Sequence, residues 1–518
     1  MGDSASHPFI ARHQAEVIGV LQGWDRLRLQ GTLRSLYHPS VLDYYLQQAG
    51  VLWKHFKAYS QRLTERIKQA AEALGQHWRR PIRYVGSSTL RKEQLARAAA
   101  QAEGIKEGLI TILSAVEPCR SWSIRRDPQT QRPGFRMEWR KCLHYYFYWQ
   151  HEHWGFCHLR LQTWFPFQVQ ICLNGREWLA RRLEAEAMAY RREANCLPWV
   201  EDVERAQALF DEQGKTDWKK LCQGLLEPCH PLHREISAPL KDGYYWTATE
   251  SEYATDVMFR DRAALGRIYP ALVHHAMLSF GSEQVLRFLK RSCQLGQADE
   301  VLSDRRQWEE GVRVKHWVAR NSVKFYDKGS VLRSEVTINE PKDFKVWRPA
   351  ENQPQGPKKW RTLRRSVADL HRRAEVSKAG TERHLAALAS VHVREPLLKT
   401  AAKPCRPAKR KGRRYRALQP FGQDAELLAA INRGEYALNG FRNRDLRAQL
   451  FAPSPEPRGR RRQAAALTRK LQLLRVHGLI RRVQKTHRYQ LTPKGRQIVT
   501  ALQAALQAST EELTRLAA

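Results

Sequence analysis

The sequence predicts an α+β protein, with a mixed α/β N-terminal region, a central β-meander with helices, and a C-terminal module of helices and one hairpin. Short apolar runs alternate with helical periodicity over the first 120 or so positions. An aromatic-rich stretch and a three-strand pattern follow in the middle of the chain. The last hundred or so residues are strongly basic and have capped helices around a hairpin.

Length and composition indicate a folded protein of several domains. The chain has 518 residues, of which 42% are hydrophobic and 9% aromatic, which is too apolar for a disordered chain. At about 100–200 residues per domain, roughly three domains are expected. We place them at 1–135 (mixed α/β), 136–400 (aromatic-rich α+β, with the meander at 311–339) and 419–518, with a basic linker at 401–418.

The charge of the chain favours a polyanionic partner. Lys and Arg number 89 against 52 Asp and Glu, a net charge of +37, and nucleic acid balances such an excess by releasing counterions on binding. A membrane surface is the alternative, but the chain shows neither an amphipathic basic helix with aromatic residues on its other face nor a lipidation signal. Without an apolar run of membrane-spanning length or a signal peptide, a cytoplasmic protein is expected.

The nine cysteines are expected to be reduced, because an odd number spread over a long chain does not suggest a disulfide framework. One cluster contains Cys222, Cys229, His230 and His233, which are residue types that bind zinc. Its spacing differs from that of paired Cys-x-x-Cys knuckles, so buried cysteines and surface histidines remain the other interpretation.

Two apolar runs near the N-terminus are expected to be buried strands that end in carboxylates. Residues 17–21 lead to Asp25, and residues 109–113 lead to Glu117. Between them, positions 53–74 have helical spacing, which Pro81 ends.

The middle of the chain is expected to form strands and then helices. Aromatic residues crowd positions 142–173, which favours a pleated sheet. Helices are predicted at 177–192, 203–213, 218–226, 262–278 and 283–290, and again at 358–389. Within the aromatic stretch, His158, Arg160 and Trp164 either stack on unpaired bases or belong to the core.

The meander ends in a hairpin whose turn contains Gly329, where positive φ is needed. Strand alternation then places Lys324, Tyr326, Arg333 and Glu335 on one face, and Val323, Phe325, Leu332 and Val336 on the other. The second set is expected to be core.

Residues 403–416 contain eight Lys and Arg, two prolines and no acid, which predicts an extended, solvated linker. Helices are predicted beyond it at 424–432, 442–450 and 461–476. A β-hairpin with strands at 479–483 and 487–491 follows, and then a final helix with Thr492 as N-cap and Pro493 at its first position. This order of elements is that of a winged helix-turn-helix.

The string from Leu473 to Ile480, followed by Arg488 to Arg496, resembles the wing of MarR-like bacterial regulators over about 75 residues. Residues 403–518 hold 26 Lys and Arg against 7 Asp and Glu, a net charge of +19. Binding to bases and phosphates is therefore expected from two groups of residues. These are Arg458, Arg460, Arg461, Arg462, Arg469 and Lys470 of the third helix, and Arg482, Lys485, His487, Arg488, Lys494 and Arg496 of the wing and the last helix. The alternative is a winged helix that contacts proteins.

The hairpin from Asn321 to Gly329, with Arg333 and Glu335 on its return strand, resembles over about 15 residues a strip of phage and plasmid rolling-circle replication initiators. The resemblance implies DNA nicking by a tyrosine nucleophile with a divalent metal, Mg²⁺ or Mn²⁺. Tyr326 would then be the nucleophile and Glu335 a carboxylate of the site. Lys324 or Arg333 would stabilise charge on phosphate.

Three further carboxylates, Asp25, Glu117 and Asp256, are candidates to join such a site. The chain lacks a His-hydrophobic-His motif, because a glutamate separates His151 from His153, so any metal would depend on carboxylates alone. The alternative is a surface ladder of charges across the hairpin, of small energetic value. Whether the chain is an enzyme is left open by the sequence.

The chain as a whole also resembles a bacterial family of unassigned function that shares the strings Arg-Leu-Gln-Thr-Trp-Phe-Pro-Phe (160–167) and Cys-Leu-Asn-Gly-Arg-Glu-Trp-Leu (172–179). The resemblance suggests a mobile-element or host-replication context. We therefore expect a DNA-binding protein of a bacterial mobile element, with strand processing by the N-terminal region. The alternative is a non-enzymatic regulator that binds DNA or structured RNA. The target site and the oligomeric state do not follow from the sequence.

Overall fold

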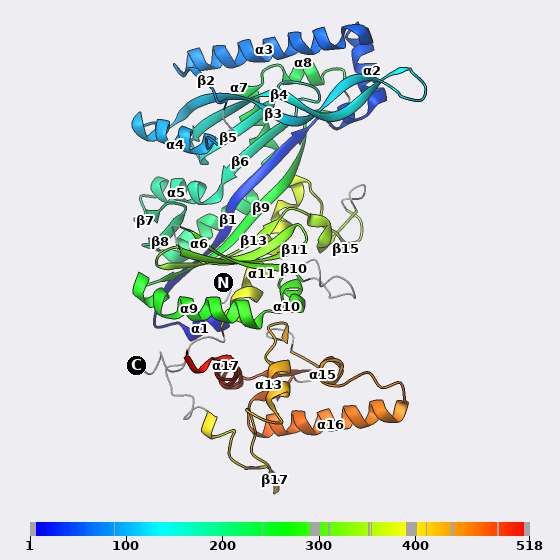
Figure 1. Ribbon diagram of the computed structural model, residues 1–518. Coiled ribbons are helices and arrows are strands. Elements are labelled where there is room, and N and C mark those ends of the chain that lie inside the picture. The colour runs from blue at the N-terminus through cyan, green and yellow to red at the C-terminus, as the bar shows by residue number, and fades with distance from the viewer. Residues whose placement is uncertain are drawn as a thin grey trace. The chain divides into compact units, whose positions relative to one another are not determined.

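The computed structural model describes the chain except for residues 1–6, 87–88, 241, 291–300, 309–310, 351–352, 354, 390–400, 411, 437–439, 484–485 and 512–518. The fold is a mixture of helices and strands around a large mixed sheet (Figure 1). The strand order in that sheet is β10-β11-β12-β13-β9-β1-β6-β5-β4-β3-β2. The chain divides into two compact units, of which the first contains residues 1–20, 255–336 and 378–518, and the second residues 21–254 and 337–377.

The second unit contains long strands that the sequence predicted only in part. Its strands are β1 (Val17–Thr32), β2 (Ile82–Tyr84), β3 (Gly108–Arg126), β4 (Pro133–His151), β5 (Gly155–Gln162), β6 (Val169–Asn174), β7 (Tyr190–Glu193), β8 (Cys196–Val200), β9 (Tyr245–Phe259), β14 (Lys345–Arg348) and β15 (Lys359–Thr362). β1 and β9 begin or end in the first unit. Because β1 runs to Thr32 and β3 to Arg126, Asp25 and Glu117 lie inside strands, and the prediction that each ends a strand was wrong.

No helix was expected at 39–48, 92–102 or 233–237, so the sequence predicted only part of the helices of this unit. They are α2 (Pro39–Gln48), α3 (Phe56–His77), α4 (Lys92–Ala102), α5 (Gly175–Ala185), α6 (Val203–Asp211), α7 (Trp218–Cys229) and α8 (His233–Ser237), with short 3₁₀ turns at Arg34–Tyr37, Trp53–His55, Glu212–Lys215, Pro341–Asp343 and Val367–Asp369. α3 packs against β2 and β3 (Figure 1). α5 ends seven residues before the predicted limit, since Tyr190–Glu193 pairs with β8 instead.

The first unit contains the meander. Its strands β10 (Val301–Trp308), β11 (Gly311–Val318), β12 (Asn321–Asp327) and β13 (Val331–Ile338) confirm the predicted three strands and add a fourth. α1 (Pro8–Arg12), α9 (Arg262–Ser279) and α10 (Ser282–Phe288) precede them, and α9 and α10 pack on β10 and β11. Val323, Phe325, Leu332 and Val336 are fully buried, as expected of the core face.

Helix α11 (Leu370–Leu388) is shorter than the helix predicted at 358–389, because Lys359–Thr362 forms β15 against β14. The predicted linker is likewise not fully extended. Residues 408–410 (β16, Ala408–Arg410) pair with β17 (Arg413–Tyr415), and Arg416 forms an ion pair with the buried Asp424.

The C-terminal elements follow the predicted order. They are α13 (Ala425–Ile431), α15 (Asn443–Leu450), α16 (Pro457–Val476), β18 (Ile480–Arg482), β19 (Tyr489–Leu491) and α17 (Pro493–Gln507). α16 begins four residues before the predicted start, with Pro457 at its first position. Thr492 caps α17 as predicted, since its side chain accepts a hydrogen bond from the Gly495 amide at 2.9 Å.

Candidate functional site

The β12–β13 hairpin of the first unit is built around a tight turn. Gly329 has φ of +80°, a conformation that favours glycine, and the Lys328 amide donates to the Val331 carbonyl oxygen at 2.9 Å. Burial raises the pKa of Asp327 at the end of β12. The turn therefore sets which side chains of the two strands share a face.

Glu335 is the centre of the polar face. The Tyr326 hydroxyl donates to Glu335 Oε2 at 2.9 Å, and Lys324 Nζ lies 2.6 Å from Oε1. Glu335 is fully buried and Lys324 almost so, whereas Tyr326 is partly exposed. The predicted sharing of one face by these three side chains is thus confirmed. The alternative of a solvent-exposed charge ladder is wrong, because the ion pair lies inside the protein.

Further cations lie on the same face of the sheet. In the register of β11 and β12, Arg313 is opposite Tyr326, and Lys315 is opposite Lys324. Side chains of directly paired residues project to the same side of a sheet. The phenol of Tyr326 therefore lies on a strongly basic part of the first unit.

Arg333 and Asp256 form a buried pair of their own. Arg333 Nε and a terminal nitrogen donate to the two carboxylate oxygens of Asp256, at 2.6 and 2.8 Å, and both side chains are 1% exposed. A bidentate pair of this kind orients both groups. The expectation that Arg333 stabilises charge on a phosphate is corrected by this contact, because its guanidinium is held inside the sheet by Asp256.

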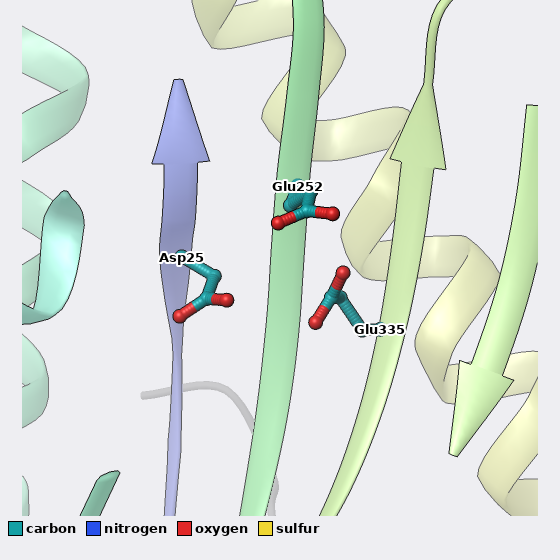
Figure 2. Close-up of side chains that lie close together, drawn as sticks. All are labelled: Asp25, Glu252 and Glu335. Atoms are coloured by element: carbon teal, nitrogen blue, oxygen red, sulfur yellow. The ribbon is translucent and has the colours of Figure 1, made fainter. Parts of the chain in front are cut away.

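Asp25, the remaining predicted catalytic residue, lies in β1 and accepts a hydrogen bond from Asn195. Figure 2 shows the carboxylates of Asp25 on β1, Glu252 on β9 and Glu335 on β13. Carboxylate oxygens are the ligands that Mg²⁺ and Mn²⁺ accept. Sequence reasoning missed Glu252, since the string Thr249-Glu250-Ser251-Glu252 contains no motif that distinguishes it.

Asp25 and Glu252 belong to the second unit and Glu335 to the first. Tyr326, Lys324, Glu335, Arg333 and Asp256, in contrast, all belong to the first unit.

Glu117 has separate partners, all in the second unit. Lys92 and Arg160 lie 2.8 and 3.0 Å from its carboxylate oxygens, and the Tyr146 hydroxyl donates to it. Burial alone would raise the pKa of Glu117, but the hydrogen bonds from Lys92 and Tyr146 and the charge of Arg160 lower it to about 2. Glu117 is therefore an ionised member of a structural network, and Arg160 is engaged there.

The possible zinc cluster does not assemble. All four residues lie in the described part of the chain, and their ligand atoms do not form a group close enough to hold a metal. The Trp149 indole donates to Cys229 Sγ at 3.4 Å, and His233 Nδ1 donates to the His230 carbonyl oxygen at 2.8 Å. Burial raises the pKa of both Cys222 and Cys229, which favours protonated thiols, and these are poor zinc ligands.

Most of the predicted nucleic-acid-binding residues lie on the surface of the C-terminal elements. On α16, Arg458, Arg460, Arg461, Arg462 and Arg469 are exposed and Lys470 is partly exposed. Arg482 and His487 beside the hairpin, and Lys494 at the start of α17, are also exposed.

Two other predicted binding residues, Arg488 and Arg496, instead donate to backbone carbonyl oxygens. Arg488 donates to the Gly440 carbonyl oxygen at 3.3 Å, and Arg496 to that of Ala386, also at 3.3 Å. Burial lowers the pKa of Arg496, so this residue is partly withdrawn from solvent. Lys485 lies outside the described residues.

Comparison of this chain with protein-family models, with curated proteins and with solved structures finds no match. Of the helices that the structure describes, none combines the length and the apolar character needed to cross a membrane.

We predict that Arg333→Met destabilises the protein by about 3–5 kcal/mol, because it leaves the Asp256 carboxylate buried without its bidentate partner. The double variant with Asp256→Asn removes the buried charge and should recover part of this loss. Thermal unfolding of the full chain measures both effects. A single variant as stable as the parent protein would show that the buried pair is not structural.

Proposed function

We propose that this chain is a nucleic-acid-binding protein and that α13 to α17 form a winged helix-turn-helix. The order of α13, α15, α16, the β18–β19 hairpin and α17 supports it. An additional antiparallel bridge joins Phe441, just before α15, to Tyr489 of β19. β19 therefore pairs with β18 on one side and with Phe441 on the other.

These elements have a hydrophobic core of their own. Leu427, Leu446, Leu467, Leu474 and Ile498, from four different helices, are all buried in one cluster. In Figure 1, α16 is the long orange helix below α13 and α15. Its apolar stripe packs inward, so the opposite side of the helix is left for solvent or a ligand.

The observation that carries the proposal is the charge on the exposed side of α16. Its first turns have Arg458, Arg460, Arg461 and Arg462, all exposed. No acidic residue lies in the first turn. A third helix of this kind can enter a major groove and contact base edges and phosphates, while the hairpin reaches the neighbouring backbone.

Strand cleavage is the second candidate function, and the Tyr326–Glu335 contact favours it. A phenol that donates to a carboxylate can lose its proton to it on attacking a phosphodiester. The phenolate oxygen would form a bond to phosphorus as the bond to the leaving 3′ or 5′ oxygen breaks. The proton on Glu335 would pass to that oxygen, which leaves a phosphotyrosyl ester and a nicked strand.

Lys324 and a divalent metal ion would assist this cleavage step in complementary ways. Lys324 neutralises Glu335 in the ground state and favours the negative charge that develops on phosphate. Mg²⁺ or Mn²⁺ would add Lewis-acid assistance through carboxylate oxygens, of which Glu335 supplies one.

A regulator that binds DNA or structured RNA without cleaving it is the non-enzymatic form of the proposal. The buried Lys324–Glu335 ion pair would then serve stability alone. The bacterial mobile-element context likewise stays an expectation from sequence resemblance.

Charge reversal on α16 tests nucleic-acid binding. We expect Arg461→Glu with Arg462→Glu to weaken binding of the full chain to a short DNA duplex by more than tenfold. The slope of log K against log salt should fall by about 2, because each lost phosphate contact removes about 0.9. Fluorescence anisotropy at several salt concentrations measures both.

The matched control is Arg83→Glu with Arg91→Glu, which makes the same change in charge at exposed positions of the second unit. This variant should keep the parent slope. If both variants lost the same amount of DNA affinity, the net charge of the chain alone would explain the loss. This result would contradict a binding surface on α16.

Incubation with supercoiled plasmid and Mg²⁺ or Mn²⁺ tests strand cleavage. We expect nicking by the parent chain, loss in Tyr326→Phe and Glu335→Gln, and retention in Tyr84→Phe, whose tyrosine is 65% exposed and distant in sequence. A labelled strand should also become attached to the protein. If no metal supports nicking, or if Tyr326→Phe nicks as well as the parent, the enzymatic candidate fails. Thermal unfolding of Glu335→Gln separates lost folding from lost chemistry.

A further inference from the structure

A basic pocket lies in the second unit and is lined by residues from the start of α3 and the turn before it, from the β3–β4 ribbon, and by Trp164. Its volume is about 350 Å³, within the range of roughly 300–1,000 Å³ usual for ligand sites. All of its lining residues belong to this unit. The size suits one small ligand rather than several joined units.

Four cations line the pocket: Lys54, Lys57, Arg125 and Arg140. Arg125 is already paired with Glu138 at 3.0 Å, and hydrogen bonds from Ser123 and Arg125 lower the pKa of that carboxyl. Arg140 donates to the Trp122 carbonyl oxygen at 3.1 Å, and its charge also helps to lower the pKa of Glu138.

Two lysines, Lys54 and Lys57, add further positive charge to the pocket. Lys54 and Lys57 are exposed, and the described part of the chain gives neither an ion pair with a carboxylate. The pocket therefore has three cations that an anionic ligand can neutralise.

Aromatic rings form the rest of the wall. Trp53, Phe56 and Trp164 line the pocket. The Trp164 indole is fixed because its nitrogen donates to the Trp122 carbonyl oxygen at 3.2 Å, and the Arg140 guanidinium lies 5.5 Å from the ring centroid. The Trp53 indole is fixed in the same way by a hydrogen bond to Asp43. Planar rings held beside cations are the elements with which proteins stack a base and hold its phosphate.

We propose that this pocket binds one nucleotide unit, with its base against Trp164 and Arg140 and its phosphate near Lys54 and Lys57. The pocket combines rings and cations, so it matches a ligand that is both aromatic and anionic. The nucleotide can come from a single strand or be free in solution, because the chemistry recognised is the same. This inference deepens the proposed nucleic-acid binding, and it concerns residues far in sequence from α16.

The test compares two variants of the full chain with equal changes in charge. Lys54→Glu with Lys57→Glu alters the pocket. Arg62→Glu with Lys68→Glu alters α3, the helix that carries Lys57, at exposed or partly exposed positions that do not line the pocket. The probes are a labelled single strand of about 12 nucleotides, within the usual range of site sizes, adenosine monophosphate and inorganic phosphate.

We expect the pocket variant to bind the strand at least about tenfold more weakly, with a salt slope lower by about 1.4, since each single-strand phosphate contact contributes about 0.7. The control variant should match the parent. Loss of strand binding alone identifies a nucleotide within a strand, and loss of adenosine monophosphate binding identifies a free nucleotide. Either result supports the site.

Equal weakening by both variants would overturn the proposal. So would inorganic phosphate competing as well as adenosine monophosphate, because the rings would then contribute nothing. The duplex experiment on α16 can fail while this one succeeds, and the reverse also holds, because the two experiments change different residues and use different probes.

Discussion

Repulsion among the cations of a chain with net charge +37 is the constraint on which the rest of the structure depends. Folding brings like charges together, and the cost is lowered when the scarce carboxylates lie where several cations can reach them. Asp369 is fully buried and close to Arg364 and Arg372, at 2.8 and 2.7 Å. Glu335 with Lys324, and Asp256 of β9 with Arg333, are likewise buried carboxylates paired with a cation. A few carboxylates, among them Asp256, Glu335 and Asp369, are thus buried beside cations, while the excess of cations over carboxylates leaves positive charge on the surface that an external anion can balance.

The cations at the surface are not spread evenly. Several of them gather at the start of α16 and several at the pocket beside α3, so that an anion can meet more than one at once. A polyphosphate chain is an anion with the required spacing, and its binding releases counterions from both partners. The same electrostatic requirement therefore supports both proposals, the duplex-binding surface on α16 and the nucleotide pocket beside α3. The polar face around Tyr326 adds a third basic region, and it has a phenol and a carboxylate in hydrogen-bond contact.

Sequence patterns predicted local structure better than they predicted contacts between residues that are distant in the sequence. The glycine turn at residue 329 and strict alternation were enough to place Lys324, Tyr326 and Glu335 on one face, because both signals act within a hairpin. Caps and apolar stripes likewise predicted α13 to α17 closely. The extent of β1 and β3 was missed because a strand paired on both sides continues through polar residues such as Asp25 and Glu117. Glu252 and the Asp256–Arg333 pair depend on contacts distant in sequence, which periodicity does not encode. The aromatic stretch was correctly assigned to strands, yet only the structure separates the buried Phe165 and Phe167 from Trp164 at the pocket.

The central claim is that the exposed basic side of α16 and the β18–β19 hairpin bind nucleic acid. Hydrogen–deuterium exchange of the full chain, with and without a saturating DNA duplex at low salt, tests it most directly. The account predicts slower exchange over Pro457–Val476 and Ile480–Arg482 when the duplex is present. Unchanged exchange in both segments, under conditions where the duplex is shown to be bound, would contradict it.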